Sequence, residues 1–145
     1  LTIVDDATHE AVAVEVERAI SGNGVARVLD RLALRRGLPL VIRSDNGKEF
    51  CSKAMVKWGH ERGVVLRLIE PGKPNQNAYI ESFNGRLRDE CLNEHWFQNV
   101  LHARTVIETW RREYNEERPK KALGGLTPAA YAKRMTKIGY PNPGL

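Results

Sequence analysis

The stretch Leu40-Val41-Ile42-Arg43-Ser44, followed at once by Asp45-Asn46-Gly47, sets the pattern for the middle of this chain. An apolar run of this length is typical of a strand, and Asp-Asn-Gly is typical turn chemistry. Residues 53–62 then have the character of a helix that stops at Gly63, where helices commonly end. The next apolar run, Val-Val-Leu-Arg-Leu-Ile at residues 64–69, reads as another strand. A strand, a helix and a strand in this order indicate an α/β domain.

The residues before this stretch predict a hairpin and one more helix. Residues 1–4 are β-prone, and residues 11–16 alternate in the way of a half-buried strand, with turn residues between the two segments. Residues 21–36 then carry apolar side chains at helical spacing, and Gly37 follows as a stop signal. We therefore expect helices packed on a mixed sheet.

The residues after it predict a loop and three helices. Residues 71–77, Pro-Gly-Lys-Pro-Asn-Gln-Asn, are a loop by composition, and residues 78–93 turn helical. A longer helix is expected at residues 99–115, and Thr127-Pro128 has the form of a helix start. The buried stripe expected on the first of these helices consists of Ile80, Phe83, Leu87 and Cys91.

Composition limits the classes of protein to which the chain can belong. Its 145 residues fit one domain, and 41% hydrophobic and 28% charged residues are close to globular averages. No apolar run approaches the roughly 18 residues of a membrane span, and the N-terminus lacks a signal-peptide pattern. Cys51 and Cys91 form neither a disulfide framework nor a CxxC pattern. We expect two buried thiols in a cytoplasmic protein.

The positive charge is concentrated near the C-terminal end. The net charge is +5, and residues 118–137 hold six of the 23 basic residues and none of the 18 acidic ones. We therefore distinguish a core, residues 1–117, from a basic tail with a short helix, residues 118–145. The tail, with Lys120 and Lys121, is a candidate contact for DNA phosphates. A tail that only improves solubility is the alternative.

Two acidic residues stand out by their surroundings. Asp45 follows the apolar run at residues 40–44, Glu81 lies in the first turns of a helix after a polar loop, and 35 residues separate them. Carboxylates at a strand end and on a facing helix can converge on Mg²⁺ or Mn²⁺, which take oxygen ligands and often need only one or two carboxylates beside a substrate phosphate. Phosphodiester chemistry is the natural use of such a pair.

Several further segments form a specific combination with these two acids. Asp-Asn-Gly alone is a weak signal, but its spacing to Ile-Glu-Ser-Phe-Asn and the basic residue seven positions after the glutamate are together specific. The segments concerned are Ser44 to Gly47, Glu49-Phe50, Pro74 to Asn93, Tyr114-Asn115, Arg118-Pro119 and Leu123 to Pro128. They resemble the DDE transposase and retroviral integrase catalytic core, and bacterial insertion-sequence transposases most of all. The resemblance covers nearly the whole chain and implies a ribonuclease-H-like fold.

The resemblance implies an activity and roles for three residues. Asp45 and Glu81 would be the second and third acids of the triad, and Arg88 would match a basic residue of the insertion-sequence members. The implied activity is metal-dependent DNA cleavage and strand transfer, with two Mg²⁺ or Mn²⁺ ions activating the attacking group and stabilising the leaving oxygen. Arg88 as a surface partner of a helix acid is the alternative.

The resemblance also implies partners. The loop residues Lys73, Asn75, Gln76 and Asn77 would touch the DNA end, unless they are only a polar connector. The expected substrates are transposon ends and target DNA, held by a dimer or larger assembly in the bacterial cytoplasm near the nucleoid, without a membrane partner.

One departure from the family pattern concerns the first catalytic aspartate. In the family it lies on a strand before the one that matches residues 1–4 here, and this sequence lacks that strand. We therefore expect an incomplete triad, a chain that is inactive as given, and a fold less stable than one in which the strand is supplied. Asp5 or Asp6 replacing the missing acid is a minor alternative. The rival functions are an inactive DNA-binding or assembly fragment and a stand-alone metal-dependent nuclease.

Overall fold

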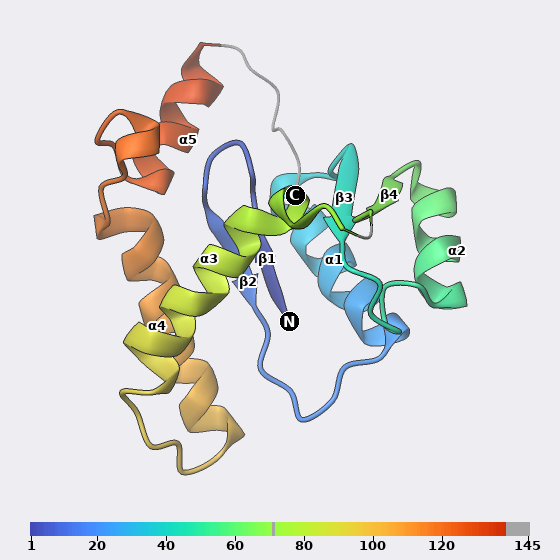
Figure 1. Cartoon of the computed structure of the whole chain (residues 1–145), viewed down its shortest axis with the longest axis horizontal. Coiled ribbons are helices and arrows are strands. Elements are labelled where there is room, and N and C mark those ends of the chain that lie inside the picture. Colours follow the sequence, from blue (N-terminus) through green and yellow to red (C-terminus); the bar gives the residue numbers. More distant parts are fainter. Residues whose placement is uncertain (71, 139–145) are drawn as a thin grey trace. The chain divides into compact units, whose positions relative to one another are not determined.

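The computed structural model describes residues 1–70 and 72–138 (Figure 1). These residues form two compact units, which are described separately. The hairpin unit comprises residues 1–17 and 79–138, and the parallel unit comprises residues 18–70 and 72–78. Residues 118–138 belong to the same unit as the helix before them, so the compact units do not divide after residue 117.

The hairpin unit begins with two antiparallel strands, as the alternation of the sequence predicts. Thr2 lies opposite Val14 and Ile3 opposite Ala13, and the register shifts between Ile3 and Val4. Helices follow from the second part of the chain (Figure 1). The elements of this unit are β1 (Thr2–Val4), β2 (Ala11–Val14), α3 (Ala78–Leu87), the π-helical turn η2 (Arg88–Leu92), α4 (Val100–Glu117), the 3-10 turn η3 (Lys121–Leu123) and α5 (Pro128–Lys137).

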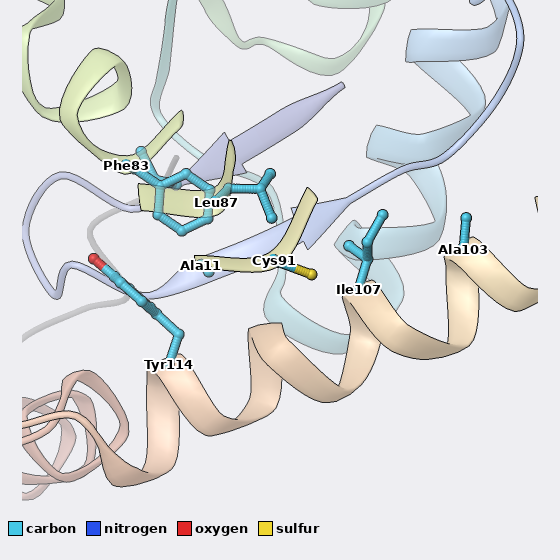
Figure 2. Packing of buried hydrophobic residues seen from close by; sticks show 8 residues of the cluster. Ala11, Phe83, Leu87, Cys91, Ala103, Ile107 and Tyr114 are labelled. Carbon is cyan, nitrogen blue, oxygen red and sulfur yellow. The ribbon is translucent and has the colours of Figure 1, made fainter. Parts of the chain in front are cut away.

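The core of the hairpin unit lies between α3, α4 and the hairpin. Figure 2 shows Phe83, Leu87 and Cys91 facing residues of α4 and of the strand β2. The Phe83 ring meets the Tyr114 ring edge to face at 5.1 Å between centroids. The predicted stripe of the helix is confirmed, with Ile80 at its partly buried margin. The other members of the buried cluster are Val4, Ala11, Ala103 and Ile107.

The parallel unit contains the strand, helix and strand predicted at residues 40–69. Val41 pairs with Val65 and Ser44 with Leu68 in a parallel ladder. Ser21 and Ser52 cap the two helices by accepting hydrogen bonds from backbone N–H groups. The elements are α1 (Gly22–Arg36), β3 (Val41–Ser44), α2 (Lys53–Arg62), β4 (Val65–Leu68) and the 3-10 turn η1 (Pro74–Asn77).

Three features differ from the sequence-based expectations. The described strands form two separate two-stranded sheets, β1–β2 and β3–β4, so the mixed sheet is present as two small sheets. Residues 74–77, expected as loop, form a 3-10 turn that leads into α3. Cys51 is exposed and only Cys91 is buried, because Cys51 lies in the turn region before α2 and not on a packed face.

None of the described helices is long and apolar enough to span a membrane.

Candidate functional site

Asp45 stands in an exposed turn directly after β3. Its Oδ1 accepts a hydrogen bond from the backbone N–H of Gly47 at 2.9 Å, and the carbonyl of Gly47 accepts one from Phe50 N–H at 3.0 Å. The carboxylate therefore organises its own turn through one oxygen. Because the side chain is exposed, it remains accessible to a ligand from solvent.

Gly47 lets a second carboxylate approach the same turn. A Cβ at this position would lie 2.9 Å from Glu49 Oε1 and 3.0 Å from Asp45 Oδ1. Any larger residue would push both acidic side chains away. Glu49 lies in one of the segments that resemble the family, but the sequence pattern carries no signal for a role. Its approach to the Asp45 turn depends on the folded backbone around Gly47.

Glu81 lies in the first turn of α3 with its side chain exposed. Among the described residues, no hydrogen bond or ion pair engages its carboxylate. Two positions later, Phe83 is fully buried, and Asn84 Oδ1 accepts a hydrogen bond from Thr2 Oγ1 of β1 at 2.7 Å. The helix is thus anchored to the hairpin while it presents Glu81 to solvent.

Arg88 begins the π-helical turn η2, where the helical register of α3 changes. Its guanidinium is exposed, and Nη2 lies 3.8 Å from where a Cβ of Gly85 would be. Short π-helical segments are rare and often occur at functional sites. The register change alters the direction in which the side chain leaves the helix.

The three predicted site residues are divided between the two units. Asp45 belongs to the parallel unit, and Glu81 and Arg88 belong to the hairpin unit. Each is presented to solvent by its own unit. Among the described residues, no three His, Cys, Asp or Glu side chains form a group that could hold a metal ion. The convergence of Asp45 and Glu81 on a metal stays a prediction.

Asp5 has a structural role in the β1–β2 turn. It is 1% exposed, and its Oδ1 accepts hydrogen bonds from the backbone N–H groups of Ala7 at 2.9 Å and Thr8 at 3.2 Å. Asp6 is exposed in the same turn. Burial and backbone contacts occupy the Asp5 carboxylate, so it is poorly suited to replace a catalytic acid.

The residues predicted to contact DNA lie in different environments. Lys73 is exposed and pairs with Glu70 at 2.7 Å, a partner that a DNA phosphate would have to displace. Asn75 is exposed and Asn77 half-buried in η1, which also contains Gln76. Lys121 is exposed at the start of η3. Of the lysines in this set, Lys121 makes no ion pair with the part of the chain that the structure describes.

Lys120 is buried, although its place in the basic tail suggests an exposed side chain. It is only 8% exposed, and its ammonium donates hydrogen bonds to the hydroxyls of Tyr79, at 3.1 Å, and Tyr114. Burial lowers the pKa of Lys120. Because the ammonium faces two phenols inside the unit, it does not offer the phosphate contact expected of it. Its two partners lie 41 and six residues away, so local sequence carries no signal for this burial.

The chain matches models of a known protein family over most of its length. Two family models, both described as "Integrase core domain", match residues 1–74 and residues 62–128. The chain belongs to the integrase core domain family. The match to residues 1–74 covers the hairpin and the strand–helix–strand segment, and the second match covers the helix that carries Glu81 and Arg88. The predicted resemblance to transposases and integrases is thereby confirmed at the level of the family.

Relatives of this integrase-core chain come from bacterial insertion elements. It is 57% identical, over 92% of its length, to the 31.7 kDa protein of insertion element IS407 from Burkholderia multivorans, and covers 48% of that protein. It is 54% identical, over its full length, to the 39.2 kDa protein of insertion element IS476 from Xanthomonas euvesicatoria, and covers 43% of it. The chain thus spans about half the length of these relatives.

A solved structure confirms the fold class. The catalytic core domain of BIV integrase matches with a TM-score of 0.72, covering 94% of this chain and 87% of that one at 18% identity. The ribonuclease-H-like architecture implied by the resemblance is therefore present. At this level of identity the likeness concerns the fold alone.

Proposed function

We propose that this integrase-core chain provides the catalytic part of a transposase, which cleaves DNA strands at transposon ends and joins them to target DNA. The observation that carries the proposal is the pair Asp45 and Glu81. With 35 residues between them, they lie within the segments that match the family, and both side chains are exposed. Buried or ion-paired acids would speak against such a role.

The donor set suits Mg²⁺ or Mn²⁺. Asp45 and Glu81 offer carboxylate oxygens, the ligands that hard divalent cations prefer, and Asp45 keeps Oδ2 after Oδ1 accepts the Gly47 hydrogen bond. When bound, the metal would supply Lewis-acid activation of the phosphodiester. Asp45 and Glu81 would hold it, and a further acid would have to complete the set.

The remaining residues would bind and orient the DNA. Arg88, exposed at the register change of the helix, would contact a phosphate near the reacting bond. Lys73, Asn75, Gln76 and Asn77 precede Glu81 on the connecting segment and would contact the DNA end, and Lys121 would contact the backbone farther away. In the reaction the attacking oxygen, from water or a DNA 3′-hydroxyl, loses its proton to solvent and forms a bond to phosphorus. The 3′-oxygen of the broken bond leaves with the electron pair and takes up a proton from solvent to become a hydroxyl.

The test is Mn²⁺-supported nicking or strand joining of a short DNA duplex by a chain extended at its N-terminus with the strand and aspartate that the resemblance implies. We expect Asp45→Asn, Glu81→Gln and EDTA each to abolish activity. Glu94→Gln serves as the matched control, because Glu94 is an exposed acid outside the proposed site. Activity that survives Glu81→Gln would overturn the proposed role of this residue.

A chain that binds DNA without cutting it would favour the alternative of a DNA-binding or assembly fragment. Binding should weaken as salt rises, because phosphate contacts release counterions, and Lys121→Met should reduce the salt slope by about one. Affinity that does not change with salt would exclude these phosphate contacts.

A further inference from the structure

We propose that Arg118 and Lys120 act together as a positioning clamp on the helix α3–η2, holding the two ends of the segment that presents Glu81 and Arg88. The inference rests on the proposed function, because it assigns the clamp a purpose in that reaction. All of these residues belong to the hairpin unit, so their mutual contacts are defined within one compact body.

Lys120 holds the N-terminal end of α3 through Tyr79. Its Nζ lies 3.1 Å from the Tyr79 hydroxyl, and 4.8 Å and 4.6 Å from the ring centroids of Tyr79 and Tyr114. A buried ammonium between two aromatic faces combines hydrogen bonding with cation–π attraction. Replacing it by an apolar group would leave two phenols, the buried Tyr114 and the partly buried Tyr79, without this donor.

The hydrogen bonds around Tyr79 are complete. Its hydroxyl donates to the carbonyl of His9 at 2.8 Å, accepts from Lys120, and lies 2.9 Å from the Tyr114 hydroxyl, which can donate to it. One proton and two lone pairs are thereby used. The network joins α3 to the β1–β2 turn, to α4 and to residue 120, and it begins two positions before Glu81.

Arg118 holds the other end through Glu90. Its Nη1 donates to Glu90 Oε2 at 2.8 Å, and its Nη2 donates to Glu90 Oε1, which makes a bidentate pair. The guanidinium also lies over the rings of Tyr114, at 5.3 Å, and Trp110, at 6.0 Å. The hydrogen bond from Arg118 lowers the pKa of Glu90. This contact begins two positions after Arg88.

The backbone at residues 118–120 allows this short segment to reach both ends of the helix α3–η2. Arg118 and Lys120 have extended φ/ψ values of −99°/105° and −128°/132°, and residues two apart in extended chain point to the same side. The segment is itself held, because Lys120 N–H donates to Leu126 O at 3.0 Å and Gly125 N–H donates to Lys120 O at 2.8 Å.

The clamp therefore complements the apolar core. Phe83 and Leu87 fix the middle of the helix, whereas Glu81 and Arg88 project to solvent near its two ends. Helix ends fray more readily than helix centres, since part of their backbone hydrogen bonding is missing. Lys120 and Arg118 restrain the two places where fraying would displace the proposed site residues.

The test compares Lys120→Met and Arg118→Met with Arg112→Met. The control also removes an arginine–glutamate pair, but Arg112 pairs with Glu108 at 3.3 Å within α4 alone. Amide hydrogen exchange is expected to accelerate at least fivefold at residues 78–82 in Lys120→Met and at residues 88–92 in Arg118→Met. The centre of α4 and the control variant should exchange as in the unaltered chain. Tyr79→Phe gives a second variant for the first end if Lys120→Met does not fold.

Activity provides the second readout. In the N-terminally extended chain, Lys120→Met and Arg118→Met are each expected to lower the rate constant of Mn²⁺-dependent strand cleavage at least tenfold with unchanged DNA affinity. Combining Arg118→Glu with Glu90→Arg should restore part of the rate. Unchanged exchange at both helix ends, or acceleration throughout the unit, would overturn the clamp. Accelerated exchange with a normal cleavage rate would overturn its role in positioning. If the N-terminally extended chain without these substitutions cuts no DNA, the proposed function fails, while the exchange result still decides the clamp.

Discussion

The two strand pairs of this protein are buried to very different degrees. In the hairpin pair, Ala11, Val12 and Ala13 are buried, and the side chain of Asn115 bonds both the N–H and the carbonyl of Ala11 at 2.7 and 2.9 Å. In the parallel pair, no residue of β4 is buried, and Val65 is 52% exposed. Parallel sheets are normally covered on both faces. The hairpin is therefore integrated into a core, whereas the parallel pair is only partly covered.

The parallel unit is stabilised mainly by its helices. Met55 and Trp58 of α2 are buried at 1% and 3% exposure, and Val25 of α1 at 1%. Asp30 links the helices, because its carboxylate accepts from Trp58 Nε1 at 2.8 Å and pairs with Arg62 at 2.7 Å. The comparison indicates that packing between helices, more than the ladder between strands, maintains this unit.

The largest effect should come from supplying another strand. A chain extended at its N-terminus by the strand that the resemblance implies should unfold at a higher urea concentration, because several residues and backbone groups would be buried at once. Hydrogen exchange should slow in β1. Equal urea midpoints for the two chains would refute this prediction.

Next in size is the removal of a core ring from the hairpin unit. Phe83→Ala should cost about 3–5 kcal/mol, since the fully buried ring leaves a cavity against Tyr114 and Trp110. The matched change in the other unit, Val65→Ala, should cost no more than about 0.5 kcal/mol. Urea unfolding measures both. Similar losses would mean that the difference in burial between the two pairs has no energetic counterpart.

A smaller loss is expected at the polar link of the parallel unit. Asp30→Ala leaves the indole N–H of Trp58 and the guanidinium of Arg62 without their shared acceptor. The cost should be about 1–3 kcal/mol. Lys57→Ala is the control, because the pair of Lys57 with Glu61 at 3.8 Å is exposed and, among the described residues, Lys57 makes no ion pair with Asp30. An Asp30→Ala chain as stable as the control would show that the link between the helices is dispensable.

The smallest effect is a pH dependence in the hairpin unit. Arg118 lowers the pKa of Glu90 from its usual 4.5, so the folded chain binds this proton less tightly than the unfolded chain. The stabilisation is complete above the pKa that Glu90 has in the unfolded chain. It is lost as the pH falls through the lower pKa that Glu90 has in the folded chain. The urea midpoint should thus fall more steeply below about pH 4.5 in the unaltered chain than in Glu90→Gln. Parallel curves would contradict this coupling. Exposure of the pair keeps the effect small.

Most of the secondary structure could be predicted because its signals are local. Helix α2 spans the expected residues 53–62, and Gly63 ends it with a positive φ of 70°. The periodic spacing of Phe83, Leu87 and Cys91 correctly predicts the face of α3 that is buried. The 3-10 turn at residues 74–77 was missed because Pro, Asn and Gln are equally typical of a loop.

The candidate site was predictable only in part. The sequence indicated Asp45, Glu81 and Arg88 as residues of interest, and the structure places all three side chains in solvent. It did not reveal the approach of Glu49 to the Asp45 turn, which depends on the backbone fold around Gly47. That Asp45, Glu81 and Arg88 act together in catalysis stays a prediction, which the cleavage assay tests.

Periodicity and caps in the sequence alone thus determined the elements of this protein, because each depends on residues that are neighbours in the chain. Its family was indicated by the order and spacing of segments between residues 44 and 128, which the sequence also records directly. Only the tertiary structure decided the environment of Lys120. Its membership of a basic run predicted a solvent-exposed cation, but Tyr79 and Tyr114 bury it in the folded unit. The physical reason is that burial is set by contacts between distant segments, and charge patterning along the chain does not record which segments meet.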